Sequence, residues 1–180
     1  MITIRKAAEA DCRTIRRLAE TAFPAAYRAI LSPPQIAYML EWMYAEPELL
    51  RQMRDGHVYY LASDEGVLCG YVSVERQAPD LFHLQRLYVL PAFQGRRIGA
   101  SLFGRAVAHV RAAHPAPCRM ELNVNRRNRA LRFYERMGMR ILREGDFAIG
   151  GGFYMNDYIL GMEIGPAEAD AGVLQNGGRR

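Results

Sequence analysis

The spacing of apolar and polar residues along the chain alternates between the two periods that distinguish helices from strands. Apolar residues recur at every fourth position from Ile98 to Val110, as one face of a helix requires, whereas residues 84–90 form a short run that suits a strand. The pattern predicts strands at residues 2–6, 57–63, 67–76, 81–90, 118–124, 140–149 and 153–164, and helices at 11–23, from 33 to 54 with a break near Pro47, from 98 onward and at 127–137.

Capping residues support several of these boundaries. Ser32 is followed by proline at the first helical position and by Gln35 three residues on, which is the pattern of a capping box. Asp11 is a candidate cap for the first helix, and Gly138 is placed to end the last one. Residues 64–66, Asp-Glu-Gly, predict a hairpin turn because glycine readily supplies a positive φ.

The order of elements is β-α-α-β-β-β-α-β-α-β-β. Most strands follow one another directly, so we expect an α/β protein of the α+β type, with a mixed, mostly antiparallel sheet and helices on its faces. No repeat and no long linker divides the chain, which predicts a single domain over residues 1–164. Residues 165–180 are small, polar and glycine-bearing, and we expect a disordered tail there.

Composition excludes several classes of protein. The 180 residues are 50% hydrophobic and 24% charged, as in ordinary soluble domains, and no apolar run approaches the ~18 residues of a membrane span. No export signal precedes the first strand, so a cytoplasmic location is expected. Cys12, Cys69 and Cys118 have neither disulfide nor metal-ligand spacing, which predicts buried packing residues and no metal site.

The net charge of +5 favours anionic partners without naming them. The densest cluster, residues 126–132, contains four arginines but no interleaved aromatic residues for base stacking. We therefore expect no nucleic acid and no membrane among the partners.

The segment between Pro91 and Gly104 has the character of a diphosphate site. A strand ends there, a turn containing Gly95, Arg96 and Arg97 follows, and a helix begins. The first amides of a helix lack intrahelical partners and lie at the positive end of its dipole. An ordinary turn with solvated arginines remains the alternative. Gly99 is followed by Ala100, so the nucleotide-triphosphatase loop is excluded, and the dinucleotide fingerprint does not fit.

Three segments together resemble the GCN5-related N-acetyltransferase (GNAT) family. They are residues 84–99, including Gln94 and Gly99 of the family's loop pattern, residues 121–139 with Phe-Tyr-Glu before Gly138, and residues 152–160. The last segment, with residues 30–33 and 39–44, is most similar to a bacterial branch that includes PaiA-type polyamine acetyltransferases. Arg97 departs from the family's pattern, which has glycine at that position.

The resemblance implies the GNAT fold, a central sheet of six to seven strands flanked by about four helices, and acetyl-coenzyme A as the acetyl donor. The strand at residues 87–89 would pair with the pantetheine arm, the loop amides would hold the pyrophosphate, and Asn128 would approach the arm from the other side. Asn128 is equally a favoured helix cap. The implied cofactor residues are Leu87, Tyr88, Val89, Gln94, Gly95, Arg96, Arg97, Ile98, Gly99, Ala100, Asn125 and Asn128.

The resemblance also implies an N-acetyltransferase that acts by direct attack in a ternary complex. Tyr134 would protonate the departing thiolate, because a phenol with a pKa near ~10 still carries its proton at neutral pH. An alkylamine must first lose a proton, at about 4–5 kcal/mol at pH 7. His83, Glu75, Glu121 or an ordered water could assist, and each of these side chains, like Tyr134, could instead be structural.

The acceptor is less well defined. Tyr27, Tyr38 and Trp42, with Tyr44, fall on the helices that cover the acceptor pocket in this family, although they also suit a helix-packing core. The branch resemblance suggests a small primary amine of polyamine type, for which glutamates 41, 46 and 48 are candidate ligands. An aminoglycoside, an amino acid, a protein N-terminus or lysine, a catalytically silent coenzyme A sensor, and a homodimer all stay open.

Overall fold

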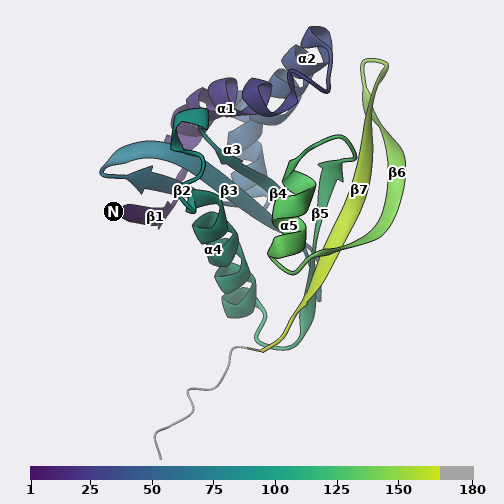
Figure 1. Cartoon of the computed structure of the whole chain (residues 1–180). Helices are drawn as coiled ribbons and strands as arrows, with labels where there is room; N and C mark the ends of the chain where they lie inside the picture. Colours follow the sequence, from purple (N-terminus) through teal and green to yellow (C-terminus); the bar gives the residue numbers. More distant parts are fainter. Residues whose placement is uncertain (167–180) are drawn as a thin grey trace, which may run out of the picture.

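A mixed sheet forms the centre of the protein in the computed structural model, which describes residues 1–166 (Figure 1). Residues 167–180, most of the predicted tail, lie outside the described residues. Within residues 1–166 the sheet has seven strands in the order β1-β2-β3-β4-β5-β7-β6. They are β1 (Ile2–Lys6), β2 (Val58–Asp64), β3 (Val67–Ala78), β4 (Leu81–Val89), β5 (Cys118–Asn125), β6 (Arg140–Gly150) and β7 (Phe153–Ile164).

Helices cover both faces of this sheet. Figure 1 shows α1, α2 and α3 on one face and α4 and α5 on the other. Each face has its own core of buried apolar side chains, which includes Tyr71 on the first face and Leu102 on the second. The helices are α1 (Cys12–Tyr27), α2 (Pro33–Tyr44), α3 (Glu46–Arg54), α4 (Ile98–Ala113) and α5 (Ala130–Arg136), and short 3₁₀ turns span Glu9–Asp11 and Pro91–Phe93. The predicted sheet is confirmed, and the break near Pro47 separates α2 from α3.

The central pair of strands separates along its length. β4 and β5 run parallel, unlike all other neighbours in the sheet, and they pair only from Leu81–Arg119 to His83–Glu121. Beyond His83, β4 continues to Val89 and β5 to Asn125 without pairing between them. The backbone of β4 from residue 84 to 89 therefore has an open side that faces β5.

Two predicted helix caps have different outcomes. The Ser32 hydroxyl accepts a hydrogen bond from the Gln35 amide at 3.3 Å, so this cap is confirmed. The reciprocal half of the box is absent, because the Gln35 side chain donates to the Tyr154 carbonyl oxygen at 2.7 Å. The prediction for Asp11 is wrong: its carboxylate does not cap α1, and accepts hydrogen bonds from Arg5 and the Ala8 amide.

Other local predictions are borne out with small shifts. Glu65 and Gly66 form the hairpin turn with φ of 50° and 80°, and Gly138 ends α5 with φ of 95°. The first helix continues past the predicted end to Tyr27 with Pro24 inside its last turn. The three cysteines are buried and unpaired. Across residues 1–166, no helix combines the length and the hydropathy of a membrane span.

Candidate active site

The N-terminus of α4 presents free backbone amides at the end of β4. Arg97 precedes the helix in the left-handed conformation, with φ of 63° and ψ of 9°, and Gly95 has φ of 80°. The first amide with an acceptor is that of Ser101, which donates to the Arg97 carbonyl oxygen at 3.0 Å. The amides of residues 98–100 have no acceptor within the described part of the chain. Free amides at the start of a helix are what an anion site of the predicted kind would require.

The two arginines of the loop are held differently. Arg96 donates to the Asp64 carboxylate at 3.2 Å, and its guanidinium lies over the Phe93 ring at 5.2 Å from the centroid. Arg97 is exposed and forms no ion pair within residues 1–166. The Gln94 side chain donates to the Val89 carbonyl oxygen at 3.2 Å, which links the loop to the end of β4. Arg97 is thus the loop cation that remains available to a ligand.

β3 packs closely against β4 where β4 and β5 separate. On the β3 side, Val89 pairs with Gly70 and Tyr88 with Tyr71. A Cβ atom added to Gly70 would lie 2.7 Å from the Tyr88 carbonyl oxygen and 3.2 Å from Leu102. Only glycine fits there without displacing the strand, so β3 supports the segment 87–89 that was predicted to pair with pantetheine.

Tyr134 lies on α5 beside this opening. Its side chain is 7% exposed and packs against Phe133 and Phe103, with ring centroids 5.2 and 6.4 Å away. Burial, with a smaller contribution from nearby Tyr27, raises the pKa of Tyr134 well above its usual value. The hydroxyl is therefore protonated at neutral pH, as a proton donor must be.

The loop between β5 and α5 is held by two asparagines. The Asn128 side-chain oxygen accepts from the amide of Ala130, the first residue of α5, at 2.9 Å, although Arg129 and not Asn128 occupies the N-cap position. Asn125 is buried, and its side-chain oxygen accepts from the Arg127 amide at 2.9 Å. The Asn128 amide also lies close to the Tyr27 hydroxyl.

Tyr27 is the point at which several elements meet. It is buried at the end of α1, and burial raises the pKa of its hydroxyl, which lies near Tyr88 and Asn128. The carboxylate of Asp157 on β7 raises the pKa of Tyr27 further. Tyr134 is close enough that Tyr27 raises its pKa in turn. The structure thus brings predicted cofactor, acceptor and catalytic residues together where β4 and β5 part.

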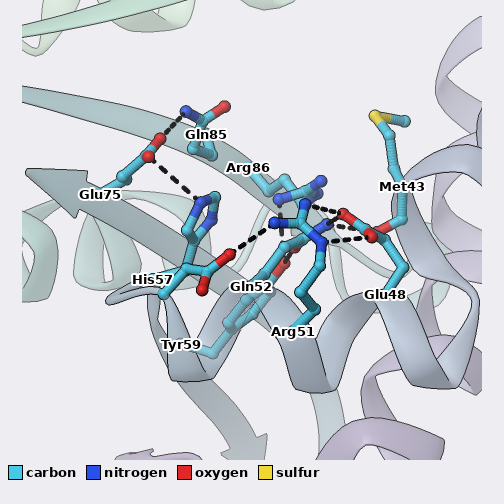
Figure 2. Close-up of polar contacts among 10 residues, drawn as sticks. Met43, Glu48, Arg51, Gln52, His57, Tyr59, Glu75, Gln85 and Arg86 are labelled. Carbon is cyan, nitrogen blue, oxygen red and sulfur yellow. Dashed lines mark hydrogen bonds and ion pairs between the residues drawn. The ribbon is translucent and has the colours of Figure 1, made fainter. Parts of the chain in front are cut away.

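The candidate bases form a row across three strands. Glu75 on β3 is opposite His83 on β4, and His83 is opposite Glu121 on β5. Glu75 is engaged by Gln85 at 2.7 Å and lies 3.4 Å from the Nε2 atom of His57. Figure 2 shows these contacts of Glu75 at the edge of a larger polar network.

His83 and Glu121 also have partners. The His83 Nε2 atom lies 3.0 Å from the Asn123 side-chain oxygen, and its Nδ1 atom is buried without a partner within the described residues. Burial lowers the pKa of His83, so the imidazole is neutral at pH 7. Glu121 is buried and accepts from the Arg143 guanidinium at 2.9 Å.

Arg86 is a buried residue near the site that the sequence did not indicate. This arginine is 8% exposed and donates to the Tyr59 hydroxyl at 2.9 Å (Figure 2). Its guanidinium also lies over the Tyr44 ring, 5.0 Å from the centroid. Its Nε atom is buried without a partner within residues 1–166. The hydroxyl of Tyr59 in turn donates to Gln52 of α3 at 2.7 Å. The available signal was that Arg86 continues the every-second-residue run of Phe82 and Leu84, where an apolar residue is expected.

The predicted acceptor aromatics differ in their exposure and in their contacts. Tyr38 donates to the Ile149 carbonyl oxygen at 2.8 Å and packs against Phe153, so it joins α2 to the turn between β6 and β7. Trp42 stacks on Tyr38 and is 48% exposed. Tyr44 is fully buried and accepts from the Tyr71 hydroxyl, which is the core role that the sequence left open.

The glutamates of the covering helices already have cationic partners. Glu41 pairs with Arg16 at 2.5 Å and Glu46 with Arg13 at 3.3 Å. Glu48 pairs with Arg51 at 2.6 Å, which lowers the pKa of its carboxyl. These exposed pairs weaken the case for a strongly acidic amine pocket on this side. Among residues 1–166, no group of three or more His, Cys, Asp or Glu side chains is placed to bind a metal ion.

Comparison with known proteins agrees with this geometry. The family described as "Acetyltransferase (GNAT) domain" matches residues 31–147, more than half of the chain. A relative from Mycobacterium tuberculosis, described as an uncharacterized N-acetyltransferase, is 28% identical over 86% of this chain and 98% of its own.

Two solved structures share the fold. The PaiA N-acetyltransferase of Thermoplasma acidophilum, in complex with coenzyme A, has a TM-score of 0.75 at 22% identity and covers 89% of this chain and 98% of its own. The ribosomal-protein-S18-alanine N-acetyltransferase of Escherichia coli has a TM-score of 0.69 at 16% identity, with coverage of 94% and 98%. By its motifs, its fold and its family match, the chain belongs to the GNAT family and is an acetyl-coenzyme A-dependent N-acetyltransferase.

Proposed function

We propose that the protein transfers the acetyl group of acetyl-coenzyme A to a primary amine of a small molecule, by direct attack while both substrates are bound. The observation that carries this proposal is the opening between β4 and β5. It has the free amides of α4 at one end and the buried hydroxyl of Tyr134 beside it. One substrate can therefore lie along β4 while a second approaches from the face covered by α1 and α2.

The cofactor-binding residues follow from this arrangement. The amides of residues 98–100 and the free guanidinium of Arg97 suit a diphosphate, because both favour negative charge at a helix N-terminus. The open side of β4 at residues 87–89 suits an amide-bearing arm that pairs as a strand would. Asn128 lies in the same region. Asn125 would contribute to cofactor binding indirectly, because it holds the loop that carries Asn128.

Tyr134 is proposed as the proton donor. The thiolate that leaves when the amine attacks needs a proton, and the buried phenol of Tyr134 carries one at neutral pH. His83 and Glu75 remain candidates to help the amine lose its proton, since His83 is neutral and both residues pair across β3 and β4. We call the face of the sheet that α1 and α2 cover, from which the amine would approach, the acceptor face.

The acceptor is proposed to be a small, aromatic-lined amine bound between Tyr27, Tyr38 and Trp42. A polyamine is supported by the branch resemblance, while the pairing of the helix glutamates with arginines counts against it. A protein N-terminus is the second candidate, because one structural neighbour is named for that reaction. A cytoplasmic location, with no nucleic acid or membrane partner, is part of the same proposal.

Tyr134→Phe tests the function. The variant keeps the packing of the ring but has no proton to donate, so we expect kcat to fall by about 10²–10⁴ while coenzyme A affinity is unchanged. Tyr154→Phe is the matched control, because Tyr154 is 56% exposed on β7. Coenzyme A release is followed with a thiol reagent over a panel containing spermidine, an aminoglycoside, lysine and an alanine-initiated peptide. Tight binding of acetyl-coenzyme A without release for any amine would favour the sensor instead.

A further inference from the structure

Asp157 carries a buried carboxylate with one oxygen left free. The side chain is 5% exposed, and its Oδ2 atom accepts from the Asn123 amide at 3.2 Å. The Oδ1 atom is buried and has no hydrogen-bond partner within the described residues. Buried carboxylate oxygens are costly when unpaired, so such an atom in a native site calls for a partner from outside the chain.

The nearest cation does not neutralise this carboxylate. Arg126, in the loop after β5, contacts Asp146 at 2.5 Å and Glu144 at 3.6 Å on β6. Its charge lowers the pKa of Asp157, but the larger effect of burial raises that pKa above its ordinary value. No lysine, arginine or histidine lies within ion-pair distance of Asp157 in residues 1–166.

The position of Asp157 places it at the reaction centre. It is opposite Asn125, the last residue of β5, which lies beyond the last pair between β4 and β5. The carboxylate of Asp157 raises the pKa of the Tyr27 hydroxyl, which lies near Tyr88. Tyr27 in turn raises the pKa of Tyr134. Asn123, which donates to the Asp157 carboxylate, is itself exposed. The carboxylate is therefore linked to the accessible surface of the acceptor face by a single hydrogen bond.

The carboxylates that the sequence suggested as bases differ from Asp157 in this respect. Both oxygens of Glu75 face partners, Gln85 on one side and His57 on the other. Glu121 is held by Arg143 through both of its oxygens. Among these three acidic residues on the acceptor face, Asp157 alone has an oxygen without a partner in the part of the chain described.

We propose that Asp157 binds the ammonium group of the acceptor and takes the proton that this group loses before it attacks the thioester. The inference rests on the proposed function. An N–H bond of the ammonium breaks and its proton passes to Oδ1 of Asp157. The C–N bond then forms, the C–S bond breaks, and Tyr134 protonates the thiolate. After the attack the nitrogen loses a second proton, and Tyr134 regains one proton through solvent. Asp157 releases the proton that it took from the ammonium group to solvent, so each turnover releases one proton overall.

The polar groups around Asp157 set its pH dependence. They are Asn123 from β5, Tyr27 from α1 and Arg126 from the loop after β5. His83 follows beyond Asn123. The pKa values of Tyr27 and Arg126 are both raised, so Tyr27 stays neutral and Arg126 stays positive over the pH range of activity. A change of activity with pH in that range therefore does not come from either residue.

Asp157→Asn tests the inference, because the amide keeps the shape and can still accept from Asn123 but cannot take a proton. The acceptor is whichever amine of the panel above gives the highest turnover, and kcat/KM is measured from acidic pH up to the pKa of that amine. We expect a loss of about 10²–10⁴ at neutral pH that shrinks as the amine deprotonates by itself. Coenzyme A affinity should not change. Asn156→Ala, an exposed neighbour on β7, is the control.

Each outcome decides the matter. A deficit that stays constant with pH would show a purely structural role for Asp157 and overturn the inference, as would an unimpaired Asp157→Asn variant. Glu75→Gln and His83→Asn are measured alongside, and a pH-dependent deficit in either of them, with none in Asp157→Asn, assigns the proton transfer elsewhere. Absence of turnover by the unaltered protein with every amine would refute the proposed function, and this inference with it.

Discussion

Replacing Arg97 by glycine should make the protein more stable and bind coenzyme A less tightly. The backbone of Arg97 has φ of 63°, in the left-handed region where a side chain costs about 1–2 kcal/mol. Glycine removes that cost but adds about 0.4–1 kcal/mol of chain entropy in the unfolded state. The net gain is about 0–1.6 kcal/mol, and each kcal/mol raises Tm by roughly 2–4 °C for a chain of this size.

Binding should change in the opposite direction. Arg97 is the exposed cation of the loop, since Arg96 is paired with Asp64 at 3.2 Å. A charge near a helix N-terminal anion site at the surface contributes about 0.3–1 kcal/mol, so its loss should raise Kd for coenzyme A roughly two- to fivefold. Higher salt should reduce the difference, because exposed charges are screened.

Two further variants separate charge from conformation. Arg97→Lys keeps both the charge and the strained backbone, while Arg97→Ala keeps the strain and loses the charge. Calorimetric titration with coenzyme A and thermal unfolding of the free protein are measured for all three. Arg97→Ala should bind as weakly as Arg97→Gly without its gain in Tm. Tighter binding by Arg97→Gly than by the original chain would show that backbone approach, and not charge, limits the loop, and would refute this reasoning.

Three other changes test the surrounding structure. Gly70→Ala should push the Tyr88 carbonyl oxygen away, destabilise the protein by about 1–3 kcal/mol in denaturant titration, and weaken coenzyme A binding. Arg86→Met should change the free energy of unfolding little, since the buried guanidinium has no carboxylate partner within residues 1–166, whereas Arg86→Ala should cost about 2–5 kcal/mol for its cavity. Asp157 has a folded-state pKa above its unfolded value, so its charge opposes folding at neutral pH. Asp157→Asn should therefore be more stable at pH 7, with the difference shrinking as pH falls through the folded pKa, and an equal difference at all pH values would contradict this.

Local elements of the fold were predictable because their signals are local. The alternation of residues in β7, the glycine in the turn at 66 and the cap at Ser32 each depend on neighbours within a few positions. The prediction for Asp11 failed because its carboxylate is engaged by Arg5, and that pairing depends on how β1 meets the first helix. Gln35 likewise bonds to Tyr154, which is 119 residues away along the chain.

The candidate site divides in the same manner. The loop after β4 and the position of Tyr134 could be found from sequence, since motif and helical period coincide there. Asp157 was not indicated by the sequence, because an acidic residue within a strand usually faces solvent. Its isolation appears only when β7 is placed beside β5 with Tyr27 above it.

The sequence by itself determined the order of elements, the helix N-terminus that can receive a diphosphate, and the family. These depend on period, turn chemistry and short motifs, which are properties of neighbouring residues. Only the tertiary structure decided that β4 and β5 separate after His83 and that Glu75 and Glu121 are engaged. It also decided that one carboxylate oxygen of Asp157 has no partner within residues 1–166. The physical reason is that the electrostatic state of a carboxylate depends on burial and on partners from distant strands, and the chain order specifies neither.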